Sequence, residues 1–111
     1  MRATGFPPKV RQQIVDRCAG RCEVMTDGCT FTAQAIHHRR ARGAGGTRRP
    51  DTNLPTNALC VCDACHRRIE SQRTEALAAG WLVPQNGVPA AVPVMYRGTR
   101  MRLDDMKVGD K

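Results

Sequence analysis

The sequence predicts a small α+β domain that relies partly on its cysteines for stability. Stretches with helical spacing of apolar residues occur together with apolar runs of strand length. Only four of the 111 residues are aromatic, so a single domain of this size has a thin core. The chain contains six cysteines, which are therefore expected to reinforce it through a metal site or through disulfides.

The first half of the chain is expected to contain one helix and one strand. Residues 1–8 form a flexible lead, and the apolar spacing then predicts a helix from Lys9 to about Ala19. The segment from Phe31 to His37 alternates in part and is expected to be a strand. Residues 39–55, with three glycines and two prolines, are expected to form a loop.

The second half predicts a strand, one or two helices and a short C-terminal β-hairpin. The apolar run from Ala58 to Val61 is expected to be a strand, after which Asp63 can cap a helix that runs through Glu70. Residues 74–79 either continue this helix or form a separate one. Further short strands are expected at Trp81–Val83, Val92–Tyr96 and Thr99–Leu103. We thus expect a main domain at residues 9–83, a strand extension at 84–103 and a flexible tail at 104–111.

The cysteine spacing favours a structural zinc site. Cys62 and Cys65 form a tight pair of the kind that zinc prefers, and a second pair flanks a glycine-containing turn. The expected ligands are Cys22, Cys29, Cys62 and Cys65. Four thiolates leave no open coordination position, so the role of such a site is structural.

Other uses of the cysteines stay open. Three disulfides are the alternative to zinc, although the N-terminus has no apolar run that resembles a signal peptide. Cys18 is a rival for Cys22, but its helical phase with Ile14 favours burial, and Cys60 is expected to be a small core residue. We therefore expect a soluble, intracellular protein.

The net charge of +8 comes mainly from arginine and indicates an anionic partner. Five arginines occur in the segment from His37 to Arg49, which contains no acidic residue. They are Arg39, Arg40, Arg42, Arg48 and Arg49. Guanidinium groups pair well with phosphate oxygens, so these residues are expected to contact nucleic acid, whereas a merely solubilising surface is the alternative. No stretch approaches about eighteen apolar residues, and no membrane span is expected.

A second set of residues can bind a catalytic metal. His66 directly follows the cysteine pair and Glu70 lies four residues further, so the two share one face of the expected helix. A histidine and a carboxylate together suit Mg²⁺, Mn²⁺ or Zn²⁺. The alternative for Glu70 is a solvated charge paired with Arg67 or Arg73.

The adjacent residues His37 and His38 add a candidate for acid–base chemistry. Neighbouring side chains of a strand point to opposite faces, so both can serve one site only if the strand ends or bends there. Histidine accepts a proton from water near neutral pH. The alternative is a pair of surface histidines beside a basic loop. Asn57 offers an amide that can brace this loop and orient a histidine.

These residues occur in an order that resembles a known motif. The chain contains Ile36-His37-His38-Arg39-Arg40, then Gly45-Gly46, and then the run from Asn57 to His66. Over about residues 18–72 it resembles the HNH endonucleases, and it is most similar to compact HNH proteins encoded by phages. The resemblance implies a ββα fold around one catalytic metal, with a zinc knuckle in support.

The resemblance implies a role for each residue of the site. His38 is the expected general base and Asn57 the bracing asparagine. His37 and His66 are the expected ligands of the catalytic metal. Relatives such as the colicin nucleases have a third histidine where this chain has Glu70, so Glu70 either replaces that ligand or leaves the position to water. The metal is expected to be Mg²⁺, Mn²⁺, Zn²⁺ or Ni²⁺.

The implied function is metal-dependent hydrolysis of DNA phosphodiester bonds. A phage-encoded protein of this kind would act in the host cytoplasm, with terminase or other DNA packaging proteins as partners. The first alternative is a zinc-ribbon module that binds DNA without cutting it, but it leaves the paired histidines, Asn57 and His66 unexplained. The other alternative is a structural phage protein in DNA packaging.

Overall fold

The computed structural model describes residues 5–41 and 50–105. This part of the chain contains three α-helices and two small antiparallel sheets, so the predicted α+β class is confirmed. The helices are α1 (Pro8–Cys18), α2 (Asp63–Ser71) and α3 (Arg73–Ala79). Strand β1 (Ala35–His38) pairs with β2 (Ala58–Val61), and β3 (Val94–Tyr96) pairs with β4 (Thr99–Met101). Short 3-10 turns occur at Pro55–Asn57, Pro89–Ala91 and Leu103–Asp105.

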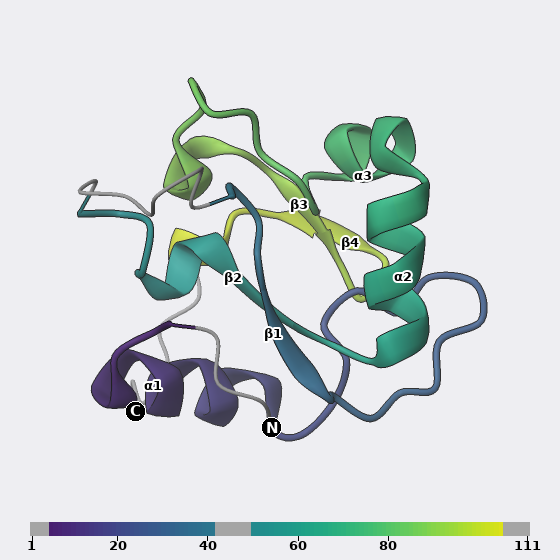
Figure 1. The fold of residues 1–111 in the computed structure, drawn as a ribbon, viewed down its shortest axis with the longest axis horizontal. Helices are drawn as coiled ribbons and strands as arrows, with labels where there is room; N and C mark the ends of the chain where they lie inside the picture. The colour runs from purple at the N-terminus through teal and green to yellow at the C-terminus, as the bar shows by residue number, and fades with distance from the viewer. Residues whose placement is uncertain (1–4, 42–49, 106–111) are drawn as a thin grey trace.

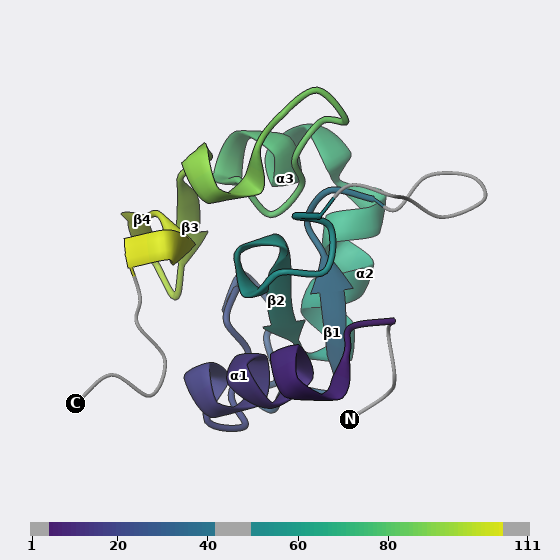
Figure 2. The same ribbon diagram turned by 90° about the vertical axis from the view of Figure 1, so that its left-hand side faces the viewer.

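Sheet β1–β2 lies between α1 on one side and the pair α2–α3 on the other (Figures 1 and 2). Successive side chains of a strand point to opposite faces, and the burial follows this alternation. Ala35, Leu59 and Val61 join a cluster with α2, α3 and the β3–β4 sheet, whereas Ile36, Ala58 and Cys60 join a smaller cluster with α1. By the same alternation His37 belongs to the side of α2, and His38, the last residue of β1, belongs to the side of α1.

The helix boundaries follow from local chemistry. Pro8 opens α1, where its missing N–H group is not needed, and Ala19 ends the helix in a left-handed conformation with φ 53°. The cap of α2 differs from the prediction, because the sulfur of Cys62, and not Asp63, accepts the hydrogen bond from the backbone N–H of Cys65. A break at Gln72 separates α2 from α3, so residues 74–79 belong to a helix of their own.

Two strand predictions need correction. The strand expected at Phe31–His37 begins only at Ala35. Phe31 adopts a left-handed φ of 69°, and Thr32 forms an isolated bridge with Arg21 instead of extending β1. The strand expected at Trp81–Val83 is wrong. Gly80 ends α3 with φ 77°, and the N–H groups of the next two residues donate to the carbonyl of Ala76, so a turn satisfies them and no ladder forms.

A buried charge network connects α1 to both sheets. Glu23 is fully buried and accepts hydrogen bonds from Arg17 at 2.7 and 2.8 Å, from the hydroxyl of Tyr96 at 2.6 Å and from the N–H of Cys60 at 2.7 Å. The Arg17 guanidinium also donates to two backbone carbonyls, those of Pro55 and Ala58. Each buried charge therefore has several polar partners, which burial of charge requires.

Candidate metal centres

Four cysteine sulfurs converge beside the start of α2. Their ligand atoms lie within 4.8 Å of one another, and the sulfurs of Cys29 and Cys62 are 3.8 Å apart. The four residues are Cys22, Cys29, Cys62 and Cys65, the set that the spacing predicts. This cluster could hold a metal ion. Cys18, the rival ligand, and Cys60 instead lie in the buried cluster against α1.

Backbone N–H groups surround these sulfurs. Those of Thr30 and Cys65 donate to the sulfur of Cys62 at 3.5 and 3.3 Å, and that of Phe31 donates to the sulfur of Cys29 at 3.2 Å. Burial acts to raise the pKa of the Cys62 thiol, but its two N–H donors outweigh burial and lower the pKa to about 6. Burial raises the pKa of Cys29 and of Cys65. Cys62 thus ionises more readily than Cys29 and Cys65, and the thiolate is the form that binds a metal.

A second group of possible ligands lies where β1 ends against α2. The ligand atoms of His37, His66 and Glu70 lie within 4.8 Å of one another. His66 and Glu70 are one turn apart on α2, with His66 Nε2 3.7 Å from a carboxylate oxygen of Glu70. The rings of His37 and His66 meet edge to face at 5.3 Å between centroids. The three expected metal-binding residues are therefore brought together, and this group could also hold an ion.

The surroundings of His37 fix its tautomer and its charge. Its side chain is buried, and its Nε2 lies 2.9 Å from the backbone carbonyl oxygen of Trp81. A carbonyl oxygen can only accept, so Nε2 carries the proton and Nδ1 carries the lone pair. Burial is the main cause that lowers the pKa of His37 to about 4. The imidazole is thus neutral near pH 7, the state in which histidine coordinates metals.

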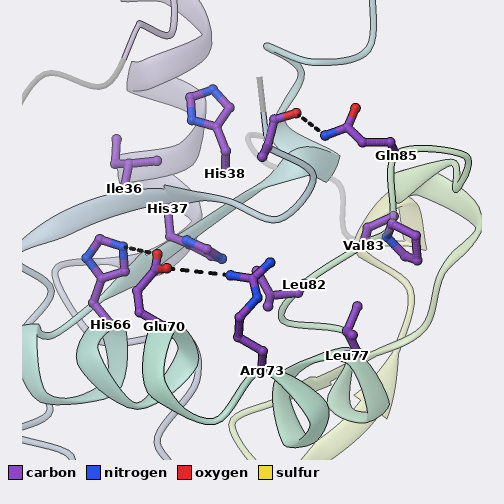
Figure 3. A pocket seen from close by; sticks show the side chains of 12 residues that line it. Ile36, His37, His38, His66, Glu70, Arg73, Leu77, Leu82, Val83 and Gln85 are labelled. Atoms are coloured by element: carbon purple, nitrogen blue, oxygen red, sulfur yellow. Dashed lines mark hydrogen bonds and ion pairs between the residues drawn. The ribbon is translucent and has the colours of Figure 1, made fainter. Parts of the chain in front are cut away.

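These groups line an open cleft of about 660 Å³ between the end of β1, helices α2 and α3, and the segment after α3 (Figure 3). Its polar lining consists of His37, His38, His66, Glu70, Arg73 and Gln85. In Figure 3 the two neighbouring imidazoles leave β1 in opposite directions, with His37 directed toward His66 and Glu70. Both imidazoles nevertheless line the cleft. Strand β1 ends at His38, so the cleft lies at the end of the strand, where both faces of the strand can be reached.

The ring of His38 is held by two residues that sequence analysis did not identify. Phe6 stacks on it at 4.2 Å between centroids with an interplanar angle of 10°. The amide oxygen of Asn53 lies 3.1 Å from His38 Nε2. Neither residue has a spacing signal, because the segment before α1 and the loop before β2 meet only in the folded chain.

Asn57 braces the chain beyond His38, as one part of its predicted role requires. It is fully buried, accepts a hydrogen bond from the N–H of Arg40 at 2.7 Å, and donates to the carbonyls of Arg40 and Thr52 at 3.0 and 2.9 Å. The other part of the prediction, that Asn57 orients a histidine, needs correction. Its side-chain hydrogen bonds go to backbone groups of the loop, and Asn53 is the asparagine whose side chain contacts His38.

The positions of Arg39 and Arg40 do not fit the expected contact with nucleic acid. Arg39 is fully buried, and its guanidinium donates to four backbone carbonyls, those of Gly80, Thr56, Pro89 and Val92. Arg40 is 2% exposed and forms an ion pair with Asp51. Both guanidinium groups hold loops together and face away from solvent. The other expected contacts, Arg42, Arg48 and Arg49, lie outside the described residues.

The two clusters differ in the chemistry they allow. A closed set of four sulfurs stabilises structure, whereas two imidazoles and a carboxylate beside an open cleft leave coordination positions for water or a ligand.

Within the described residues, no helix is long and apolar enough to cross a membrane. Comparison with protein-family models, curated proteins and solved structures gave no match to this chain.

Proposed function

We propose that the chain is a metal-dependent endonuclease of the HNH type that hydrolyses phosphodiester bonds of DNA. The observation that supports this most is the convergence of His37, His66 and Glu70 within 4.8 Å in an open cleft that His38 also lines. The order β1, β2, α2 around this group is the ββα order that the resemblance to HNH nucleases implies. A module that only binds DNA would need no such open ligand set.

The four-cysteine cluster fits zinc. With Zn–S bonds of about 2.3 Å, a regular tetrahedron places its sulfurs about 3.8 Å apart. The sulfurs of Cys29 and Cys62 are 3.8 Å apart. Zinc held by all four thiolates would join the loop after α1 to the start of α2, and so it would fix the helix that carries His66 and Glu70.

The residues of the cleft have distinct roles in the proposed reaction. A divalent cation bound to His37, His66 and Glu70 would polarise the phosphate and neutralise charge on the leaving 3′ oxygen. His38 accepts a proton from the attacking water. Asn53 and Phe6 hold the His38 ring, and Asn57 fixes the loop that follows it. Attack of water on phosphorus breaks the bond to the 3′ oxygen, which takes a proton from solvent water, so the products would carry 5′-phosphate and 3′-hydroxyl ends.

A plasmid-nicking assay tests the proposal. Protein treated briefly with EDTA is first shown by elemental analysis to retain one zinc per chain, and is then supplied in turn with Mg²⁺, Mn²⁺, Zn²⁺ or Ni²⁺. We expect nicking with at least one metal. His38→Ala should lower the rate by about two to four orders of magnitude, since general base catalysis contributes about that much.

A second cleft variant is His66→Ala, and the matched control outside the cleft is Gln12→Ala on the exposed side of α1. His66→Ala should lose activity through weaker metal binding, and Gln12→Ala should keep it. DNA binding without nicking under any metal would contradict the proposal and favour the binding module. Full activity of His38→Ala would remove His38 as the base.

A further inference from the structure

Arg73 brings a guanidinium group to the lining of the cleft. A nuclease cleft has to bind a phosphate group, but the buried guanidinium groups of Arg39 and Arg40 bond protein carbonyls and Asp51. Of the described residues that line the cleft, Arg73 is the one arginine or lysine. A phosphate that enters the described cleft therefore meets the charge of Arg73.

Arg73 is held more loosely than the other paired arginines near it. Its side chain is 62% exposed, and its Nη1 lies 3.7 Å from a carboxylate oxygen of Glu70, beyond hydrogen-bonding distance. Arg68, by contrast, donates to both oxygens of Glu75 at 2.7 and 3.0 Å. The guanidinium of Arg73 thus keeps donors for a ligand, while its position beside the cluster is maintained by charge attraction.

Glu70 places this guanidinium next to the candidate metal ligands. One carboxylate oxygen of Glu70 lies 3.7 Å from His66 Nε2, and the other lies 3.7 Å from Arg73 Nη1. In Figure 3, His66 and Arg73 reach the carboxylate from opposite sides. A cation bound by Glu70 would share the charge of the carboxylate, so the attraction between Glu70 and Arg73 would become weaker. The same cation would attract an anion to a place where Arg73 can pair with it.

We propose that Arg73 binds a non-bridging oxygen of the phosphate that lies at the His37–His66–Glu70 cluster. This inference rests on the proposed function and extends it to the residue that recognises the reacting group. A guanidinium donates two parallel hydrogen bonds to a phosphate, which fixes its orientation as well as its charge. With substrate and metal bound, Arg73 would exchange its long contact with Glu70 for these bonds.

Single-turnover cleavage of a short fluorescent DNA duplex, at saturating protein and saturating metal, tests this role. Saturation removes differences in affinity, so the rate reports on groups at the reacting phosphate. Arg73→Ala should slow this rate by about a hundredfold, the usual effect of removing one donor to a reacting oxyanion. Arg73→Lys, which keeps the charge without the fork, should recover part of the loss.

The matched control is Arg100→Ala, which removes the same charge from the exposed strand β4, away from the cleft. It should leave the saturated rate unchanged. A wild-type saturated rate in Arg73→Ala would overturn the proposal. So would a deficit in Arg73→Ala that appears only below saturating metal, because Arg73 would then act only by positioning Glu70. Circular dichroism and one retained zinc per chain would show that each variant is folded.

A second readout separates this proposal from the proposed function. If the wild-type protein cuts no DNA with any metal, nuclease activity is excluded, and the anisotropy of the same duplex is titrated with protein over a series of salt concentrations. Loss of one phosphate contact lowers the slope of log affinity against log salt by about one. We expect this change in Arg73→Ala and not in Arg100→Ala, and identical slopes would overturn phosphate binding by Arg73.

Discussion

The amide oxygen of Asn53 lies 3.1 Å from Nε2 of His38, a contact between the loop before β2 and the end of β1. An amide oxygen can only accept, so Nε2 carries the proton and the lone pair of the ring is on Nδ1. Phe6 stacks on the same ring. The imidazole of His38 is thus fixed in orientation and tautomer by side chains that are distant from it in sequence.

Replacement of Asn53 should therefore impair cleavage without loss of the fold. We expect Asn53→Ala to slow cleavage at saturating DNA by about tenfold, since orientation of the base is lost while the base itself remains. Asn53→Asp keeps an acceptor oxygen at the same place and should retain more of the rate. Asn86→Ala, an exposed asparagine, serves as control. Equal rates for all three variants would show that Asn53 has no part in positioning His38.

The cysteine cluster makes a prediction that separates ligands from core residues. Cys62→Ser should release zinc and lose the fold, because metal binding and folding are coupled in such sites. Cys18→Ala removes a buried cysteine outside the cluster and should keep one zinc per chain. Elemental analysis and circular dichroism measure both effects. A folded Cys62→Ser protein with its full zinc content would contradict the four-cysteine site.

Glu70 should determine which metal supports activity. Carboxylate oxygens favour Mg²⁺ and Mn²⁺, whereas imidazole favours Zn²⁺ and Ni²⁺. Glu70→His should therefore reduce nicking with Mg²⁺ relative to Ni²⁺, as compared with the wild-type protein in the same plasmid assay. Glu75→His, on the neighbouring helix and outside the cleft, is the control. An unchanged order of metals would mean that Glu70 does not bind the catalytic ion.

Sequence patterns predicted much of the fold because the relevant signals are local. The apolar run at Ala58–Val61 and the spacing within each cysteine pair depend on neighbours in the chain. The strand is confirmed, and the four predicted cysteines lie close enough together that they could hold a metal ion. The convergence of His37 with His66 followed from order along the chain together with the resemblance. The strand and the tight cysteine pair are read from neighbouring residues, whereas the meeting of His37 with His66 is read from the resemblance.

The features that were missed depend on tertiary contacts. Arg39 lies in an arginine-rich sequence beside a glycine-rich loop and was expected at the surface, but the fold places four backbone carbonyls around its guanidinium. No sequence pattern encodes such a set of acceptors. Asn53 and Phe6 meet His38 for the same reason. The strand expected at Trp81–Val83 failed because apolar content alone does not distinguish a strand from a buried turn.

The Glu23 network is expected to dominate the stability of the core. Glu23→Gln removes the charge that pairs with Arg17, whose side chain is 2% exposed, and leaves a buried cation without its counter-ion. Loss of one partner from a buried pair costs about 3–5 kcal/mol, whereas Tyr96→Phe, which removes one hydrogen bond to the same carboxylate, should cost about 1 kcal/mol. Denaturant unfolding measures both. Equal losses would mean that the ion pair contributes no more than a hydrogen bond.

Tyr96 should make the fold sensitive to alkali. Burial first, and then the charge of Glu23, raise the pKa of Tyr96 above its ordinary value. The unfolded chain loses this proton at about pH 10. The folded chain retains this proton, so the stability that Tyr96 contributes is fully present below that pH and is lost as the pH rises through the folded pKa.

The chain has one tyrosine, so tyrosinate absorbance follows this residue alone. We expect ionisation to coincide with alkaline unfolding, and Tyr96→Phe to weaken this pH dependence. Ionisation near pH 10 in a protein that stays folded would contradict the burial of the Tyr96 hydroxyl against Glu23.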